Sequence, residues 1–317
     1  MQHVQCRGHA QVWDDQARMI QFLVTREHAY TMQSFLASWG RDLAGRIGIL
    51  SYEDLIAGAE FTHRDTAFIF SDLDRLAAWP QARALIARMH GELNKRYGAG
   101  RTLNDPERSL LRFPLLRLLH EQGINRFNVY RPGEGPPPRR FPVFLRPESG
   151  HEPGKIVLLR DEAAYRAALD ELVRQGAPIK DYVAVEFCDT STAGLYRKYG
   201  AFVVGDRIVP RHIFFSRDWL VKMPDLAEPA MIEEERAFMA SDAHAEVLRA
   251  TARAARIEYG RIDYGLLAGR PQVWEINTNP MLASAISDGI PARREAHLRF
   301  VAAIAEAFRA IDPARER

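Results

Sequence analysis

The stretch that decides the fold is RIDYGLLAGRPQVWEINTNPML, residues 261–282 of a 317-residue chain. It contains two strand-like runs, 261–267 and 271–276, separated by the turn sequence Ala-Gly-Arg. Two such runs on either side of a glycine-containing turn predict a β-hairpin. We therefore expect these runs to lie side by side as antiparallel strands.

The register of this hairpin brings two carboxylates together. Folding about Gly269 places Asp263 opposite Glu275 and Arg261 opposite Asn277, and opposed Cβ atoms lie about 4.5–5.5 Å apart. Two facing carboxylates repel each other unless a cation lies between them. Two carboxylates and an amide oxygen are hard donors that suit Mg²⁺. The alternative is that these side chains lie on a solvated sheet face and that Asn277 helps a turn.

Strict strand alternation makes two further predictions about faces. Trp274 and Ile276 are expected on the apolar face of the hairpin, opposite Glu275. In the run 207–215, the same rule places Arg211 on one face with Ile213.

Composition narrows the class of protein. The length predicts two or three domains or subdomains, and the formal charge of +2 gives no general attraction for nucleic acid. Two cysteines without a CxxC motif exclude a disulfide framework and a cysteine zinc site. No apolar run approaches a membrane span, and the first residues do not match a signal peptide. We therefore expect a cytoplasmic protein with reduced thiols.

The rest of the chain alternates strand-like and helix-like segments, which favours α/β layers at the N-terminus. The proline-rich run 131–142 predicts a linker or domain boundary. Asp161 is a good N-cap for a helix ending before Gly176. The other predictions are strands at 47–50, 67–70, 141–146, 155–159, 182–187, 199–204 and 207–215, and helices at 79–95, 108–122, 233–259 (one or two) and 297–311.

The segments RID at 261–263 and EINTNP at 275–280 resemble the closing hairpin of ATP-grasp enzymes such as D-alanine–D-alanine ligase and glutathione synthetase. The resemblance implies an α+β ATP-grasp fold preceded by a small α/β domain. The implied boundaries are residues 1–100 for the N-terminal domain and 101–317 for the ATP-grasp domain, with a lid at about 141–187. Its implied cofactors are ATP and Mg²⁺.

The resemblance also assigns roles in the hairpin. It implies Asp263, Glu275 and Asn277 as Mg²⁺ ligands. It implies Arg261 as the catalytic cation near the transferred phosphate or the developing oxyanion.

Three upstream segments match the places where this family binds the nucleotide. The family usually has Lys at the end of the first lid strand, where this chain has Arg146, which keeps the charge but changes the geometry. Each segment also has a plain alternative: a surface loop, a buried strand end, or an outer sheet face. The implied nucleotide-binding residues are Arg146, Ser149, Gly150 and Lys155 in the lid, Glu186, Phe187 and Asp189 in the hinge, and Lys198 and Arg211 on a strand pair.

The function implied by the resemblance is ATP-dependent ligation of a carboxylate to an amine through an acylphosphate. The partners would be a small-molecule or peptide carboxylate and an amine, with no nucleic acid and no membrane. Two alternatives remain open, an ATP-grasp kinase acting on a hydroxyl and a nucleotide-binding member without turnover. A P-loop and a GxGxxG dinucleotide motif are absent from the sequence.

Overall fold

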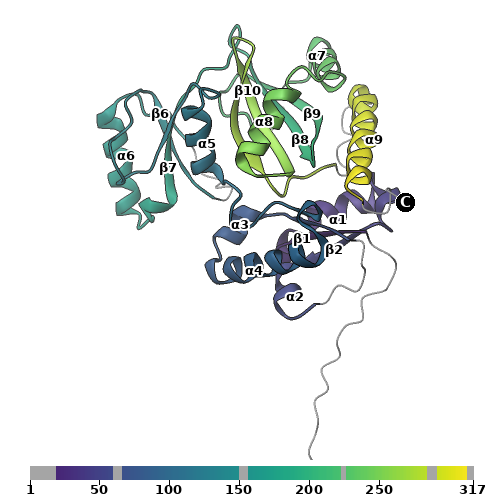
Figure 1. Cartoon of the computed structure of the whole chain (residues 1–317). Coiled ribbons are helices and arrows are strands. Elements are labelled where there is room, and N and C mark those ends of the chain that lie inside the picture. Colours follow the sequence, from purple (N-terminus) through teal and green to yellow (C-terminus); the bar gives the residue numbers. More distant parts are fainter. Residues whose placement is uncertain (1–18, 60–65, 150–155, 223–225, 284–290, 313–317) are drawn as a thin grey trace, which may run out of the picture.

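Three β-sheets organise the chain, and they follow one another along the sequence (Figure 1). The computed structural model describes residues 19–59, 66–149, 156–222, 226–283 and 291–312. Among these residues, no helix is long and apolar enough to cross a membrane.

The first sheet is parallel, and we call it the N-terminal sheet. Its strands are short apolar runs, as expected for parallel strands buried on both faces. The predicted strands at 47–50 and 67–70 are confirmed, and a last short strand extends the sheet to Leu103. In sheet order the strands are β2 (Ile47–Ser51), β1 (Ile20–Val24), β3 (Ala67–Phe70) and β4 (Thr102–Leu103), with helices α1 (Tyr30–Ala37), α2 (Tyr52–Ile56), α3 (Leu73–Ala77) and α4 (Pro80–Tyr97).

The second sheet, which we call the lid sheet, is small and antiparallel. In sheet order its strands are β5 (Val129–Tyr130), β7 (Tyr182–Glu186) and β6 (Val143–Pro147), and helix α6 (Glu162–Arg174) packs beside them. The predicted cap is confirmed, because Asp161 accepts a hydrogen bond from Ala164 N–H at 2.8 Å. The proline-rich run lies between β5 and β6, inside this unit. The strand predicted at 155–159 reduces to a single bridge from Leu159 to Val143 in the described part.

The third sheet is antiparallel and we call it the large sheet. In sheet order it contains β11 (Arg270–Asn277), β10 (Tyr259–Leu267), β8 (Tyr196–Val204) and β9 (Arg207–Ser216). Its core on one face includes α5 (Arg112–Glu121) and α8 (Ala245–Ala255), and α9 (Arg294–Ile311) packs on the other. The run 233–259 forms two helices, α7 (Pro229–Met239) and α8, before β10 begins.

Short 3-10 turns connect these elements. They are η1 (Arg26–His28), η2 (Arg41–Leu43), η3 (Ala99–Arg101), η4 (Ile179–Asp181) and η6 (Pro291–Arg293).

The predicted register of the β10–β11 hairpin is confirmed, with Asp263 opposite Glu275 and Arg261 opposite Asn277. The connection is a two-residue turn, Ala268-Gly269, with φ of 50° and 76°. Positive φ at both turn residues matches the right-handed twist of the flanking strands.

A bulge in β11 then restores the predicted pairing. The register shifts by one residue between Asp263 and Tyr264, which leaves Trp274 as the extra residue. The expectation that Trp274 shares a face with Ile276 is therefore wrong. Trp274 lines the same cavity as Glu275, whereas Ile276 packs in the core on the other face.

A second bulge redirects β9. Gly200 pairs with His212 and Ala201 with Pro210, so Arg211 is the extra residue. The expectation that Arg211 shares a face with Ile213 is also wrong. Ile213 packs in the core with α8, whereas Arg211 lies over the ring of Phe300 in α9.

One buried asparagine joins the N-terminal sheet to the large sheet. Asn104 donates through Nδ2 to the carbonyls of Phe70 at 2.9 Å and Tyr259 at 2.8 Å. Its Oδ1 accepts from the backbone N–H groups of Glu258 and Tyr259. The backbone N–H of Asn104 donates to the Glu258 carboxylate at 2.7 Å. Asn104 is fully buried and has a φ of 64°, which asparagine tolerates better than most residues.

Candidate functional site

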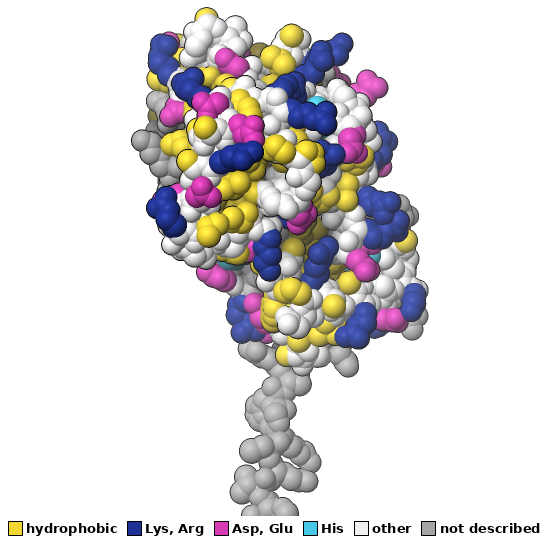
Figure 2. Space-filling view, turned by 90° about the vertical axis from the view of Figure 1, so that its left-hand side faces the viewer, with side chains coloured by type: hydrophobic (Ala, Val, Ile, Leu, Met, Phe, Trp, Pro, Cys, Tyr) yellow, Lys and Arg dark blue, Asp and Glu magenta, His cyan; other side chains and the backbone are white. Residues whose placement is uncertain are grey.

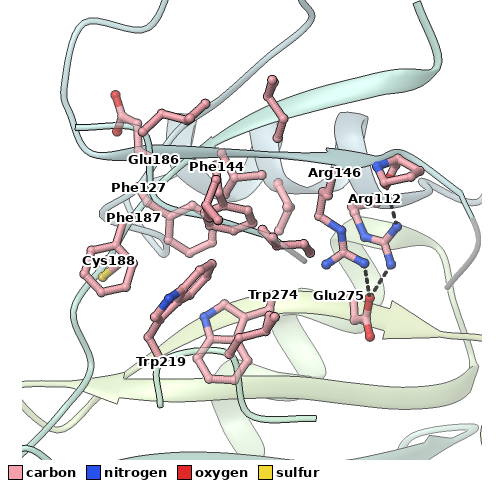
Figure 3. Close-up of a pocket in the computed structure, with 18 of the residues that line it drawn as sticks. Arg112, Phe127, Phe144, Arg146, Glu186, Phe187, Cys188, Trp219, Trp274 and Glu275 are labelled. Atoms are coloured by element: carbon pink, nitrogen blue, oxygen red, sulfur yellow. Dashed lines mark hydrogen bonds and ion pairs between the residues drawn. The ribbon is translucent and has the colours of Figure 1, made fainter. Parts of the chain in front are cut away.

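A cavity of about 590 Å³ lies between the lid sheet and the β10–β11 hairpin (Figure 3). This size falls within the range of small-molecule sites, about 300–1,000 Å³. The face of the molecule that carries the lid mixes hydrophobic side chains with both signs of charge (Figure 2). No single sign dominates the described part of that face, in agreement with the near-neutral sequence charge.

One end of the cavity is aromatic. Trp219 approaches Phe144 with ring centroids 5.1 Å apart, and it meets Phe187 edge-on at 5.6 Å. Trp274 and Phe127 also line this end. These rings come from the lid sheet, from the segment after β9 and from the hairpin. They provide flat apolar surfaces for a planar ring system.

The other end of the cavity is charged, and Glu275 is at its centre. Arg112 donates to Glu275 Oε2, and Arg146 Nη2 lies 3.7 Å from the same oxygen. Burial alone would raise the pKa of Glu275, but the positive charges of Arg112 and Arg146 outweigh burial and hold that pKa well below its ordinary value. Neither contact uses Oε1.

Asp263 is the second carboxylate at this end and is 1% exposed. Arg261 donates two hydrogen bonds to the Asp263 carboxylate, at 2.6 and 2.9 Å. Lys198 Nζ forms an ion pair with Asp263 Oδ2 at 3.0 Å. Four cations therefore face two carboxylates here: Arg112, Arg146, Lys198 and Arg261 against Asp263 and Glu275. The excess positive charge, partly buried, suits a polyanion.

Sequence reasoning missed Arg112, which begins α5. Its side chain is 6% exposed and also donates to the backbone carbonyls of Pro147 and Glu148 at the end of β6. It therefore connects α5, the lid sheet and the hairpin. No spacing motif marks it, because its partner Glu275 lies far away in the sequence.

Asp74, in α3, does not line the cavity, but it interacts electrostatically with Arg112 and Glu275. Burial raises the pKa of Asp74 to about 6, Arg112 acts in the opposite sense, and Glu275 and Asp72 raise it further. An acid of this kind changes charge close to neutral pH.

Strand β7 ends in the carboxylate of Glu186, whose hydrogen-bond donors all come from residues 128–140. Glu186 is 4% exposed and accepts from Asn128 N–H at 2.9 Å and from Tyr130 Oη at 2.8 Å. Arg140 adds a hydrogen bond of 3.0 Å through Nε and a second contact through Nη2. Burial opposes ionisation of Glu186, but these donors together lower its pKa.

The remaining implied residues occupy different places. Phe187 lines the aromatic end, but its amide already donates to the Pro142 carbonyl at 2.9 Å. Asp189 is exposed beyond the cavity and accepts from Ser191 N–H at 2.9 Å. Ser149 is also exposed. Gly150 and Lys155 lie outside the described residues.

Like Ser149 and Asp189, two further implied residues, Asn277 and Arg211, do not line the cavity. Asn277 Oδ1 accepts from the amide of Asn279 at 2.9 Å. Arg211 lies on the edge strand β9, with its Nε 3.0 Å from the Leu282 carbonyl.

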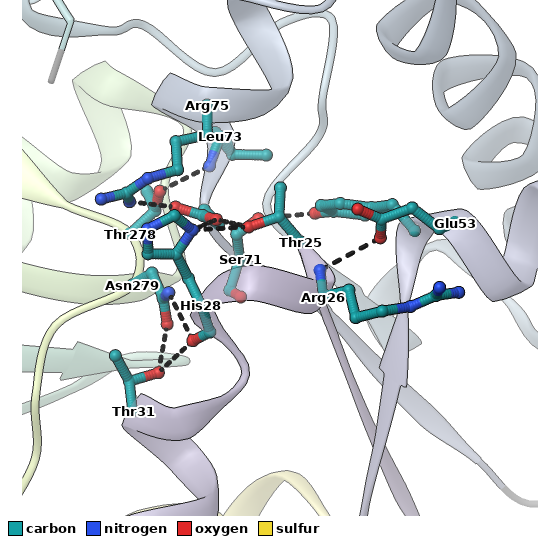
Figure 4. Close-up of polar contacts among 12 residues, drawn as sticks. Thr25, Arg26, His28, Thr31, Glu53, Ser71, Leu73, Arg75, Thr278 and Asn279 are labelled. Atoms are coloured by element: carbon teal, nitrogen blue, oxygen red, sulfur yellow. Dashed lines mark hydrogen bonds and ion pairs between the residues drawn. The ribbon is translucent and has the colours of Figure 1, made fainter.

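The residues after Asn277 are held by loops of the N-terminal sheet (Figure 4). Thr278 accepts from the amides of Asp72 and Leu73 through its carbonyl and Oγ1, at 3.4 and 2.9 Å. Asn279 donates to the His28 carbonyl at 3.2 Å. These contacts fix the end of β11, so the N-terminal domain helps to position the hairpin carboxylates.

The donor set fits a hard divalent cation. Glu275 keeps Oε1 without a hydrogen bond from the described residues, and each oxygen of Asp263 has two lone pairs. No group of three or more His, Cys, Asp and Glu able to hold a metal occurs in the described part. Any cation here would rely on these two carboxylates, an amide and further oxygen donors from a bound ligand.

The chain resembles known proteins in structure but not detectably in sequence. No family model and no curated protein sequence matches the chain. D-alanine–D-alanine ligase from Bacillus anthracis, solved with ATP, aligns at a TM-score of 0.50 and 15% identity, covering 92% of this chain and 98% of that one. The ATP-grasp ligase PsnB, solved with a minimal precursor, gives 0.53 and 13%, covering 91% and 99%. D-cycloserine synthetase DcsG gives 0.50 and 18%, covering 90% and 99%.

These alignments span nearly the full length of each protein. The chain therefore has the ATP-grasp fold, in which two α+β units face each other across a cleft. The predicted α+β class and the expected ATP-grasp resemblance are confirmed.

Proposed function

We propose that the protein is an ATP-dependent ligase that joins a carboxylate to an amine through an acylphosphate. The observation that carries the proposal is one cavity with an aromatic end and an end where four cations face two register-opposed carboxylates. A nucleoside triphosphate has the same polarity, with a flat base at one end and a polyanion at the other. The ATP-grasp fold of known ligases supports this choice.

In this proposal the base of ATP lies among Phe144, Phe187 and Trp219. The triphosphate extends towards Arg146, Lys198 and Arg112, all of which line the charged end. Glu186 would support the hinge from within the lid, and Asp189 would accept a hydrogen bond from a ribose hydroxyl. Ser149, Gly150 and Lys155 would bind the phosphates.

Asp263, Glu275 and Asn277 would hold Mg²⁺. The ion would neutralise phosphate charge and orient the transferred group. Because Arg112 and Arg146 now share Glu275 Oε2, the carboxylate can accept a further cation through Oε1 while the arginines turn to phosphate oxygens. Arg261, held by Asp263 through two hydrogen bonds, would supply a cation near the transferred phosphate or the developing oxyanion.

The chemistry follows from charge. A substrate carboxylate oxygen attacks the γ-phosphorus and the bond to the bridging oxygen of ADP breaks, which gives an acylphosphate. The amine, deprotonated by solvent, then attacks the carbonyl carbon. The carbon–oxygen bond to phosphate breaks, and the second amine proton leaves with phosphate. Arg261 stabilises the oxyanion formed in between. The substrate would be a small-molecule or peptide carboxylate.

The test is a screen of carboxylates with Mg²⁺-ATP and hydroxylamine. We expect one class of acid to give a hydroxamate, with ADP and phosphate released in equal amounts and no product when ATP or Mg²⁺ is omitted. A phosphorylated hydroxyl compound without free phosphate would identify a kinase. Binding of Mg²⁺-ATP without any turnover would identify a non-catalytic nucleotide-binding protein. Either result would overturn the ligase proposal.

A further inference from the structure

Two arginines use the same carboxylate as the proposed Mg²⁺ site. Arg112 donates a hydrogen bond from Nη2 to Glu275 Oε2, and Nη2 of Arg146 lies 3.7 Å from the same oxygen. All three side chains line the cavity, and both arginines point at Glu275 (Figure 3). A carboxylate that a divalent cation would use is therefore already paired with positive side chains of the chain itself.

The charges at this end of the cavity oppose the binding of a further cation. Asp263 is paired in the same way as Glu275, by Arg261 and by Lys198. Four positive side chains therefore face two negative ones, which leaves an excess of two positive charges. A divalent cation would double that excess, whereas the negative charges of a triphosphate would offset it.

Two other acids near Arg112 do not reverse the sign of this charge. Burial raises the pKa of Asp74, in α3, to about 6, so Asp74 adds at most one negative charge. Glu148 is already paired, because Arg131 Nη2 lies 2.6 Å from its Oε2. The charged end of the cavity therefore remains positive in the part of the chain that the structure describes.

The two arginines keep hydrogen-bonding capacity that Glu275 does not use. The Nε atoms of Arg112 and Arg146 are both buried, and neither has a hydrogen-bond partner among the described residues. The pKa of Arg146 is lowered to about 10, mainly by burial and then by the charge of Arg112. Because a guanidinium presents several N–H donors that match phosphate oxygens, both side chains would gain hydrogen bonds by turning to a polyphosphate.

We propose that Arg112 and Arg146 compete with a divalent cation for Glu275, so that the cation binds tightly only after a polyphosphate has taken over the two arginines. This inference rests on the Mg²⁺ site of the proposed function and adds the order in which that site is filled. It does not depend on the reaction. A kinase or a non-catalytic nucleotide-binding protein would need the same exchange of partners at Glu275.

Arg112 is the stronger competitor of the two. It makes a hydrogen bond to Glu275, whereas Arg146 makes an ion pair at 3.7 Å. The lid contacts of Arg112 use a different nitrogen, because Nη1 donates to the carbonyls of Pro147 and Glu148 while Nη2 donates to Glu275. Arg112 can therefore release Glu275 through Nη2 and keep its contacts with the end of β6.

The first experiment measures Mn²⁺ binding without nucleotide, from the electron paramagnetic resonance signal of the free ion. The wild type should bind Mn²⁺ weakly. Arg112→Gln should bind it at least about tenfold more tightly, because the charge of Glu275 is then less fully paired. Arg146→Gln should show a smaller gain. Arg117→Gln, which removes another arginine of α5 that does not line the cavity, is the matched control and should bind Mn²⁺ like the wild type.

The second experiment locates the gain in affinity. Adding Glu275→Gln to Arg112→Gln should remove the extra Mn²⁺ affinity, because the carboxylate under competition is then lost. A gain that persisted in the double variant would come from another place and would overturn the inference. If Arg112→Gln does not fold, the same comparison is made with Arg146→Gln, since Arg146 contacts Glu275 only as an ion pair.

The third experiment repeats the titration with a saturating concentration of the β,γ-imido analogue of ATP. The analogue should raise the Mn²⁺ affinity of the wild type more than that of Arg112→Gln, because the variant has one arginine fewer to be drawn away from Glu275. Chelation of Mn²⁺ by the analogue is common to both proteins. The difference between them therefore measures the coupling that the arginines provide.

Two further outcomes would overturn the inference, and they differ in what they mean for the proposed function. If Mn²⁺ binds with the analogue, but neither Arg112→Gln nor Arg146→Gln binds it more tightly than the wild type without nucleotide, the arginines do not compete with the cation. The ligase proposal then stands. If Mn²⁺ binds to none of the proteins, with or without the analogue, the metal site of the proposed function fails as well.

Discussion

Glu186 and Glu275 are buried glutamates at opposite ends of the same cavity, and the proton donors around them differ in origin. Every donor to Glu186 comes from residues 128–140, within the lid unit itself. The cations at Glu275 come from α5 and from β6, two elements outside the large sheet that carries Glu275, and they converge on one oxygen.

The difference separates a carboxylate whose oxygens are both hydrogen-bonded within the lid unit from one to which the proposed function gives a role. Donors from the lid unit satisfy both oxygens of Glu186, so we expect its charge to stabilise the lid. Glu275 faces two arginines, and among the described residues neither its hydrogen bond nor its ion pairs involve Oε1. Both pKa values are lowered, so the direction of the shift alone does not separate the two roles.

The largest expected effect comes from neutralising Glu275. Glu275→Gln should abolish turnover, because the proposed Mg²⁺ site loses a charge, while the fold remains intact. Loss of a buried partner also leaves Arg112 unpaired, which we expect to cost about 3–5 kcal/mol without ligand. Mg²⁺-ATP should therefore raise the melting temperature of the variant much less than that of the wild type.

Glu121→Gln, a change at an exposed site of α5, is the control for that experiment and should behave like wild type. Normal turnover and a normal rise in melting temperature with Mg²⁺-ATP in Glu275→Gln would contradict the prediction. Glu275 would then have no role that distinguishes it from Glu186.

Glu186→Gln should mainly lower the stability of the lid sheet, whereas Glu275→Gln should mainly abolish turnover. We expect it to destabilise the lid by about 1–3 kcal/mol, because an amide cannot accept from all the donors that surround Glu186. Hydrogen exchange should rise in β5 and β7 and stay unchanged in β10. Faster exchange spread evenly over all three sheets would contradict a role confined to the lid.

The pH dependence of the lid sharpens the same point. The folded-state pKa of Glu186 is lowered, so its contribution to stability is present above its ordinary pKa and is lost as the pH falls through the folded value. Wild-type exchange in β7 should therefore rise below about pH 4, and Glu186→Gln should remove that dependence.

The smallest effect concerns Asp74. Its pKa is raised to about 6, so it gains a negative charge as the pH rises from 5 to 7. That charge opposes a polyanion at the neighbouring Arg112. Between pH 5 and 7, the ATP affinity of the wild type should therefore fall by about two- to threefold more than the ATP affinity of Asp74→Asn. Identical pH profiles for the two proteins would remove Asp74 from the site.

The sequence predicted the parts of the site that depend on local periodicity. Symmetric folding about Gly269 predicted the pairing of Asp263 with Glu275, but the two-residue turn produces that pairing only because the bulge at Trp274 shifts the register. The bulges at Trp274 and Arg211 were not predictable, because one extra residue in a strand leaves no compositional mark and yet reverses a face. Arg112 was not predictable either, since only the tertiary fold brings α5 to the hairpin.

Asn104 connects two sheets through a single side chain. Its five hydrogen bonds join the end of β3 to the start of β10 in a buried position. Replacing Asn104 by a residue without a side-chain amide would leave several buried backbone groups without partners. The loss would fall on β10, the strand that carries Arg261 and Asp263, so a residue outside the cavity helps to determine the position of the charged end of the cavity.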